Sequence, residues 1–151
     1  MATWGEFAEA APDLAAAGQR LFYQFGVGLG FLATVRNDGG PRLHPMCPMI
    51  AGGRIYAFII PSPKRDDLLR DGRYAMHSFP PKDVDDEFYL SGRAALVSDS
   101  VKRAELVAAY HIPVPDDHEL FSFDVERALL VTYKHRGDFS PTKRTWRDPN
   151  K

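Results

Sequence analysis

Three polar side chains stand where a short apolar run gives way to a segment with a helical pattern. Ser62, Lys64 and Arg65 follow the run "RIYAFII" (54–60). Serine is a frequent N-cap, so one interpretation is a capped helix with a solvated first turn. Two cations in that turn oppose the helix dipole, and a bound anion would offset this cost because free amides and positive charge converge on it. The segment therefore predicts a phosphate-binding site at the start of a helix over 64–71.

The histidines give weaker patterns. His111, His118 and His135 lack a carboxylate or a second histidine at the spacing of metal ligands, so no metal site is predicted. His44 and His77 fall in segments expected to be strands, where a neighbour can satisfy the ring by hydrogen bonding. We expect a structural role for His77.

Cys47 is the only cysteine, which excludes an intrachain disulfide and any metal site built on several thiolates. A reducing compartment is therefore expected. The sequence has no Cys-His-Asn pattern around Cys47, so a nucleophilic role is not favoured. A backbone contact near a cofactor is the preferred interpretation.

Length and charge narrow the class of protein. The 151 residues suit one domain, and 19 Lys+Arg against 20 Asp+Glu give a net charge of −1. This balance argues against a general nucleic-acid binder. The acidic N-terminal segment does not have the pattern of a secretory signal peptide. No apolar run approaches the ~20 residues that a membrane-spanning helix needs. We expect a soluble cytoplasmic protein with no membrane or nucleic-acid partner.

The periodicity of apolar residues predicts the elements. An N-terminal helix is expected at about 8–24. Gly26, Gly28 and Gly30 follow it without the βαβ context of a dinucleotide fingerprint, so we interpret them as a flexible entry to the first strand. A helix that begins at Asp99 or Ser100 is also expected. The predicted strands are 31–35, 42–50, 54–60, 73–79, 88–98 and one or two over 120–135.

Several residues refine this pattern. The turn "NDGG" (37–40) predicts a hairpin. Pro45 and Pro48 cannot donate to a ladder, so 42–50 must be an edge or bulged strand. Gly92 indicates a bulge or bend. Many short strands with only short helices predict a mainly β fold, an antiparallel barrel, and argue against a parallel doubly wound sheet.

The order of the segments resembles a known family. "LATVRNDGGPRLHPM", "GGRIYAFII", "SPKRDDLLRDGRYAMHSF", "EFYLSGRA" and a terminal "TWR" follow one another as in the pyridoxamine 5′-phosphate oxidase-like family, over about residues 20–147. The resemblance implies a single domain over 1–151, with a six-stranded antiparallel split β-barrel of the FMN-binding type at about 29–147. It also implies a homodimer with each flavin in a groove between protomers.

The resemblance further implies cofactor-binding residues from three segments. They are His44, Pro45, Met46, Cys47, Ser62, Lys64, Arg65, Trp146 and Arg147. Ser62 and Lys64 would contact the cofactor phosphate, with Arg65 nearby. The strand 44–47 would lie along the side of the flavin. Trp146 and Arg147 would approach the cofactor, often from the second subunit.

Some positions depart from the pyridoxamine phosphate oxidases proper. In those enzymes a strand arginine stands where His44 stands, a lysine where Met49 stands, and a glutamine near the flavin where Glu87 stands. Their C-terminal Arg-x-His-type element is not recognisable either. The resemblance therefore implies a reductase of the wider superfamily rather than that oxidase.

The expected function is a flavin-dependent oxidoreductase that binds FMN and reduces or oxidises an unidentified small molecule. The catalytic residues are not assigned. One alternative is the 8-hydroxy-5-deazaflavin coenzyme on the same fold, whose longer acidic tail would need extra cations such as Arg36, Arg42, Arg54 and Arg65. Another is a non-catalytic flavin or haem binder with His44 or His77 as iron ligand. The last is a structural barrel without a cofactor.

Overall fold

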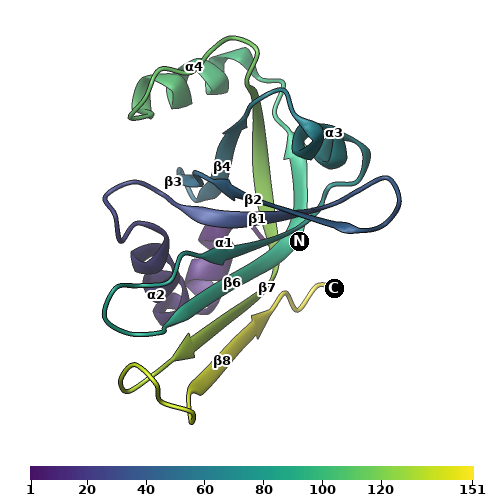
Figure 1. The fold of residues 1–151 in the computed structure, drawn as a ribbon. Helices are drawn as coiled ribbons and strands as arrows, with labels where there is room; N and C mark the ends of the chain where they lie inside the picture. The colour runs from purple at the N-terminus through teal and green to yellow at the C-terminus, as the bar shows by residue number, and fades with distance from the viewer.

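The computed structural model describes residues 1–151, in which antiparallel strands form one curled sheet with four helices around it (Figure 1). The helices are α1 (Trp4–Ala10), α2 (Pro12–Phe22), α3 (Pro63–Arg70) and α4 (Ser100–Ala109). The strands are β1 (Gly30–Val35), β2 (Pro41–Met46), β3 (Met49–Ala51), β4 (Arg54–Ile59), β5 (Arg73–Ser78), β6 (Glu87–Leu96), β7 (Glu119–Thr132) and β8 (Thr142–Arg147). The predicted mainly β, antiparallel architecture is confirmed.

The path of the sheet returns to its own start. Its order is β2-β1-β5-β6-β7-β4-β3, with β8 paired to β7. The strands at the two ends of this path, β2 and β3, are consecutive in the chain and are joined by Cys47 and Pro48. We call these two residues the junction. At this point the two ends of the sheet are joined by the covalent chain and by no ladder of hydrogen bonds, so the barrel is split here.

The number of strands differs from the prediction of six. The predicted strand 42–50 is two strands, because its first part pairs with β1 and its last part pairs with β4. Pro48 has no N–H to donate, so the ladder breaks there. The C-terminal segment, for which no strand was predicted, pairs with β7 as β8. The sheet thus has eight strands.

The N-terminal segment is two helices rather than the single predicted one at about 8–24. A capping box between Thr3 and Glu6 starts α1. The chain breaks at Ala11, and Pro12 occupies the first position of α2, where its missing N–H costs nothing.

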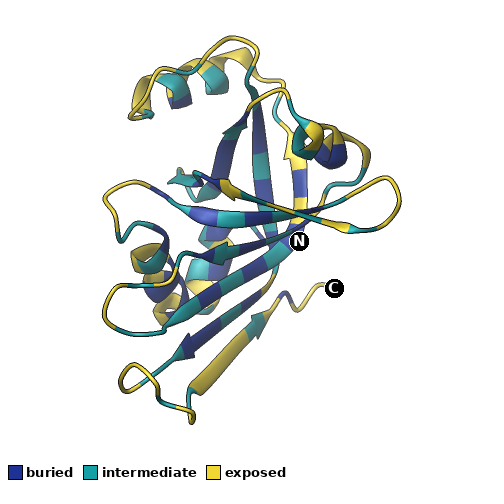
Figure 2. Ribbon diagram, in the orientation of Figure 1, coloured by how far each residue is buried: buried dark blue, intermediate teal, exposed yellow.

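Aromatic side chains from both helices fill the core. Phe7 of α1 and Phe22 of α2 are fully buried against Phe88 of β6. A Cβ atom at Gly18 would lie 2.3 Å from the Phe88 ring, so α2 packs closely on the sheet only because this residue is glycine. Figure 2 shows the buried residues along the central strands, whereas β8 is exposed along most of its length.

The bulge predicted at Gly92 is confirmed. The register between β6 and β7 shifts between Ser91 and Gly92. A Cβ atom at Gly92 would lie 1.9 Å from the carbonyl oxygen of Asp124. The close approach needs glycine, and the irregularity bends the two longest strands so that the sheet can curl.

A buried carboxylate fixes α3 to the sheet. Asp67 is 3% exposed and accepts hydrogen bonds from Thr34 Oγ1 of β1 (2.8 Å) and Arg42 Nε of β2 (2.7 Å). Arg70 donates to its other oxygen at 3.1 Å. Burial opposes ionisation of this carboxyl, but the three hydrogen bonds outweigh it and hold the pKa of Asp67 below its usual range. The start of α3 is thereby held at a fixed place above β2.

Replacing Asp67 by asparagine is expected to destabilise the fold. The substitution leaves the guanidinium groups of Arg42 and Arg70 without their charged partner, so we expect a loss of about 1–3 kcal/mol in the free energy of unfolding. Urea titration measures it. Asp66→Asn is the matched control, because this neighbouring carboxylate is 62% exposed and contacts only Arg65. Equal effects of the two substitutions would contradict the anchoring role of Asp67.

The stability difference between the wild type and Asp67→Asn is expected to depend on pH. Because the pKa of Asp67 is lowered by folding, its stabilisation is present above the unfolded-state value of about 3.9 and is lost as the pH falls through the lower folded-state value. Free energies of unfolding measured from about pH 7 to about pH 3 test this sign. We expect the two curves to converge at the acidic end, and a gap that widens there would contradict it.

Candidate functional site

The N-terminus of α3 has no side-chain cap. Ser62 occupies the N-cap position with an extended backbone (φ −172°, ψ 161°), as the simple helix-start interpretation predicts. Its hydroxyl instead donates to the carbonyl oxygen of Ile60 at 2.8 Å. Pro63 has no N–H, and the amides of Arg65 and Asp66 donate to the carbonyl oxygen of Ser62 at 3.0 and 3.2 Å. The amide of Lys64 is therefore the donor that the first turn of α3 leaves for a ligand.

Lys64 is a part-buried cation without an anionic partner. No carboxylate lies within ion-pair distance of it, whereas the neighbouring Arg65 contacts Asp66 at 3.2 Å and Glu119 at 3.6 Å. Burial lowers the pKa of the Lys64 ammonium, and Cys47 opposes this shift in part. Of the two predicted phosphate-site cations, Lys64 is free to bind an anion and Arg65 is already engaged.

His44 lies on β2 next to this cation. Its Nε2 atom is buried and has no hydrogen-bond partner. Burial lowers the pKa of the ring, and the charges of Lys64 and Arg42 lower it further, against an opposing effect of Asp67. The neutral imidazole of His44 thus has a nitrogen without a hydrogen-bond partner, and the Lys64 ammonium beside it has no counter-charge. Both groups lack a polar partner within the chain.

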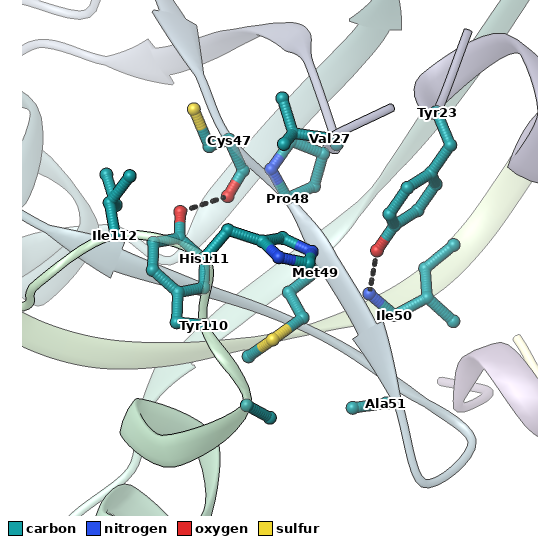
Figure 3. A pocket seen from close by; sticks show the side chains of 12 residues that line it. Tyr23, Val27, Cys47, Pro48, Met49, Ile50, Ala51, Tyr110, His111 and Ile112 are labelled. Carbon is teal, nitrogen blue, oxygen red and sulfur yellow. Dashed lines mark hydrogen bonds between the residues drawn. The ribbon is translucent and has the colours of Figure 1, made fainter. Parts of the chain in front are cut away.

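An apolar pocket of about 330 Å³ opens beside the junction (Figure 3). Its walls are the loop after α2, the chain from the junction to the end of β3, and the end of α4. The lining residues are Tyr23, Val27, Gly28, Cys47, Pro48, Met49, Ile50, Ala51, Ala109, Tyr110, His111 and Ile112.

Two tyrosines hold the backbone at the walls of this pocket. The hydroxyl of Tyr110 donates to the carbonyl oxygen of Cys47 at 3.3 Å, and the amide of Ile50 donates to the hydroxyl of Tyr23 at 2.9 Å (Figure 3). Burial and the contact with Cys47 raise the pKa of Tyr110 to about 12. These side chains satisfy backbone groups that the interrupted ladder leaves free.

The glycine-rich entry to β1 has a structural role that differs from the predicted flexibility. A Cβ atom at Gly28 would lie 1.8 Å from the carbonyl oxygen of Pro48. The loop therefore packs directly on the junction, and a larger residue would separate them. Gly26 adopts a φ of +86°, which favours glycine and turns the chain out of α2.

The remaining predicted site residues lie in other surroundings. Pro45 is exposed on β2, and Met46 is 6% exposed in the core. Trp146 packs against Phe7 with ring centroids 5.0 Å apart, and Arg147 is exposed on β8. Figure 1 shows β8 well separated from α3. One chain thus brings 44–47 and 62–65 together, but not 146–147.

His77 has hydrogen-bonding surroundings on another face of the sheet. Its Nδ1 atom lies 2.6 Å from the carbonyl oxygen of Ser78, and its Nε2 atom lies 3.7 Å from Glu87 Oε1. The Glu87 carboxylate also accepts a hydrogen bond from the Tyr133 hydroxyl at 3.2 Å. No group of three or more His, Cys, Asp or Glu side chains is arranged to hold a metal ion. No helix has the length and apolar composition to cross a bilayer.

Sequence reasoning missed the residues that form the far wall of the pocket. Tyr23 follows one helix, Tyr110 follows another, and Ile112 lies in the loop after the second. The available signal was an apolar and aromatic cluster, "YHI", at the start of that loop. Its partner residues lie more than sixty positions away in the chain, so only the fold reveals the pocket.

Solved structures share this fold. A heme binding protein from Mycobacterium smegmatis has a TM-score of 0.65 and 16% identity, over 87% of this chain and 57% of that one, so our chain spans little more than half of its length. A protein from Clostridium acetobutylicum related to general stress protein 26 of B. subtilis, of the pyridoxinephosphate oxidase family, has a TM-score of 0.64 and 12% identity over 97% of both chains. A NimC/NimA family protein from Clostridium acetobutylicum has a TM-score of 0.59 and 14% identity over 85% and 90%.

These similarities confirm the resemblance at the level of the fold. The chain has the architecture of the pyridoxamine 5′-phosphate oxidase-like split barrel. No family model matches its sequence, and a search of the curated proteins finds no match.

The Lys64→Ala variant is expected to raise the pKa of His44, because it removes a positive charge that disfavours the imidazolium. An NMR titration of the ring resonances measures the shift. Lys102→Ala is the matched control, since that lysine lies on α4 and pairs with Glu105. An unchanged or lower pKa of His44 in Lys64→Ala would contradict the electrostatic coupling of the two residues.

Proposed function

We propose that the protein is a flavin-dependent oxidoreductase that binds FMN with its phosphate at the N-terminus of α3. The observation that carries the proposal is the unpaired, part-buried ammonium of Lys64 beside the unpartnered Nε2 atom of His44. Proteins rarely keep such groups unsatisfied, because desolvation of an unpaired charge is costly. A dianionic phosphate would satisfy both the ammonium of Lys64 and the amide of the same residue, which has no acceptor within the protein.

The residues present fit the parts of this cofactor. Lys64 would bind the phosphate, and the Ser62 hydroxyl could turn from Ile60 to donate to it. The strand 44–47 would flank the ring, and the junction offers backbone groups that are not committed to a ladder. The cofactor would supply hydride or electron transfer, while the protein binds and orients it.

A second copy of the chain belongs to this proposal. Trp146 and Arg147, which the resemblance assigns to the cofactor, lie on β8, and β8 is well separated from α3, which carries Lys64 (Figure 1). Leu43, Ile60 and Leu69 are large apolar residues near β2 and α3, and they are 64%, 47% and 49% exposed. A homodimer that covers this surface would bring the C-terminal strand of one protomer to the site of the other.

The arginines considered for a deazaflavin coenzyme are already in ion pairs. Arg36 contacts Asp38, Arg42 contacts Asp67, Arg54 contacts Asp124, and Arg65 contacts Asp66 and Glu119. The longer acidic tail of the deazaflavin coenzyme would have to displace these carboxylates before it could pair with the arginines. This favours FMN over the deazaflavin coenzyme as the cofactor of the site.

Haem is a second candidate because of His44. An imidazole whose pKa is lowered stays neutral at physiological pH, and its buried Nε2 atom has no other partner, as an axial ligand requires. One of the structures that share the fold is described as a heme binding protein. A Soret band on reconstitution with haem, lost in His44→Ala, would support this candidate, and a flavin spectrum of the purified protein would support FMN instead.

Lys64→Ala is expected to weaken FMN binding at least about tenfold, or about 1.4 kcal/mol, because it removes a charge-assisted contact to the phosphate. Fluorescence titration of the apoprotein with FMN measures the dissociation constant. Lys102→Ala is the matched control, since that lysine lies on α4 and pairs with Glu105.

Riboflavin, which lacks the phosphate, provides the second comparison. Its affinity should differ little between the wild type and Lys64→Ala. Unchanged FMN affinity in Lys64→Ala would refute the phosphate assignment, and a wild type that binds neither FMN nor the deazaflavin coenzyme would refute the flavin function.

A further inference from the structure

We propose that the pocket beside the junction binds an uncharged, planar aromatic molecule that carries a hydrogen-bond acceptor oxygen. This inference rests on the proposed function, in which such a molecule belongs to the class of substrates that the flavin site converts. The proposal follows from the charge, the polar groups, the size and the position of the pocket.

The lining of the pocket selects for a neutral ligand. Nine of the twelve lining residues are hydrophobic, and none is Lys, Arg, Asp or Glu. Met49, Ile50 and Ile112 present aliphatic and thioether groups to the space (Figure 3). His111 is the only lining residue that can become cationic, so a carboxylate or phosphate moved into these surroundings would lose hydration without gaining a permanent counter-charge.

The polar groups at the wall select for an acceptor. The Tyr110 hydroxyl already donates to the Cys47 carbonyl. The Tyr23 hydroxyl accepts from the Ile50 amide, and its own proton is given to no protein group. A hydroxyl has one donor and two acceptor positions, so Tyr23 can donate to a carbonyl or similar oxygen of a ligand.

The position of the pocket links it to the cation site. Cys47 lines the pocket, and the same residue lies close enough to Lys64 to affect the pKa of its ammonium. Lys64 itself is not part of the lining. An anion bound at Lys64 and a neutral ring bound in the pocket would therefore both lie beside Cys47, close enough for the ring to be the substrate of a cofactor whose phosphate is held by Lys64.

The size of the pocket limits the ligand. A volume of about 330 Å³ lies at the lower end of the range for small-molecule sites. It suits one or two fused rings and not a dinucleotide. Ile112 is 61% exposed at the wall although it is a large aliphatic residue, and a ring in the pocket would cover part of it.

The first test compares two probes of the same shape and different charge. The apoprotein is titrated with 2-acetylnaphthalene, a neutral ketone, and with 2-naphthoate, its anionic counterpart, by ligand-observed NMR. We expect the ketone to bind at least about tenfold more tightly, because the pocket offers no counter-charge. Equal or tighter binding of 2-naphthoate, above all if Lys64→Ala abolishes it, would overturn the proposal.

The second test places the ligand in this pocket by a matched pair of substitutions. Ile112→Asp puts a carboxylate at the wall, whereas Val101→Asp makes the same change on α4 at a residue that is 76% exposed and outside the lining. We expect Ile112→Asp to weaken the ketone at least about fivefold and Val101→Asp to leave it within about twofold. Equal effects of the two substitutions would overturn the assignment.

A third comparison tests whether the Tyr23 hydroxyl donates a hydrogen bond to the ligand. The ketone should bind more tightly than 2-ethylnaphthalene, which has no acceptor, and Tyr23→Phe should remove most of this preference. A preference that survives in Tyr23→Phe would show that Tyr23 is not the donor.

The tests separate this inference from the flavin function. FMN affinity is measured on the same samples. If FMN binds and the ketone does not, the inference on the pocket fails alone. If the ketone binds as expected but FMN does not, the pocket stands and the flavin function fails.

Discussion

The structure depends on one constraint in the backbone, the change of pairing partner between Met46 and Met49. Before this point the chain forms a ladder with β1, and after it the chain forms a ladder with β4, at the opposite end of the sheet path. Pro48 cannot donate a hydrogen bond, so neither ladder can extend through it. The barrel is consequently split here, and backbone groups that are paired elsewhere in the sheet must find other partners.

The surroundings of the junction follow from that split. Tyr110 and Tyr23 reach it from two helix ends and bind the backbone of Cys47 and Ile50. Gly28 allows the loop before β1 to press against Pro48. Side chains that approach a gap from several elements leave an irregular space between them, and the apolar pocket is that space. The split barrel thus provides a concave surface without any insertion into the fold.

The helix α3 combines two opposite electrostatic situations within one turn. Asp67 faces the sheet, where hydrogen bonds from Thr34, Arg42 and Arg70 satisfy it. Lys64 faces the junction, where no carboxylate compensates it. The paired charge fixes the helix to the sheet, and the unpaired charge marks the place at which we propose that the phosphate binds. Arg65 resembles Lys64 in the sequence, but its ion pairs with Asp66 and Glu119 make it a structural group.

The sequence predicted those features that depend on neighbouring residues. The helix start at Ser62, the hairpin turn before β2 and the bulge at Gly92 all have local signals, and the fold class followed from the number of short strands. The split of 42–50 was foreseen only as an irregularity, because the new partner of Met49 is decided by the path of the whole sheet. The pocket was not predicted, since Tyr23, Cys47 and Tyr110 meet only through the fold. The packing of Trp146 against Phe7, a contact between the two ends of the chain, had no signal in the sequence, and the expected place of Trp146 at the cofactor of a second subunit stays a prediction.

The two prolines of β2 affect how the protein behaves at high concentration. This strand is one end of the sheet path, and it carries proline at positions 41 and 45. Proline is tolerated in an edge strand where its nitrogen faces away from the neighbouring strand, so two of the three outward donors at positions 41, 43 and 45 are missing. A foreign strand could not complete a ladder along this edge. The barrel can therefore remain open at its split without offering a template for aggregation.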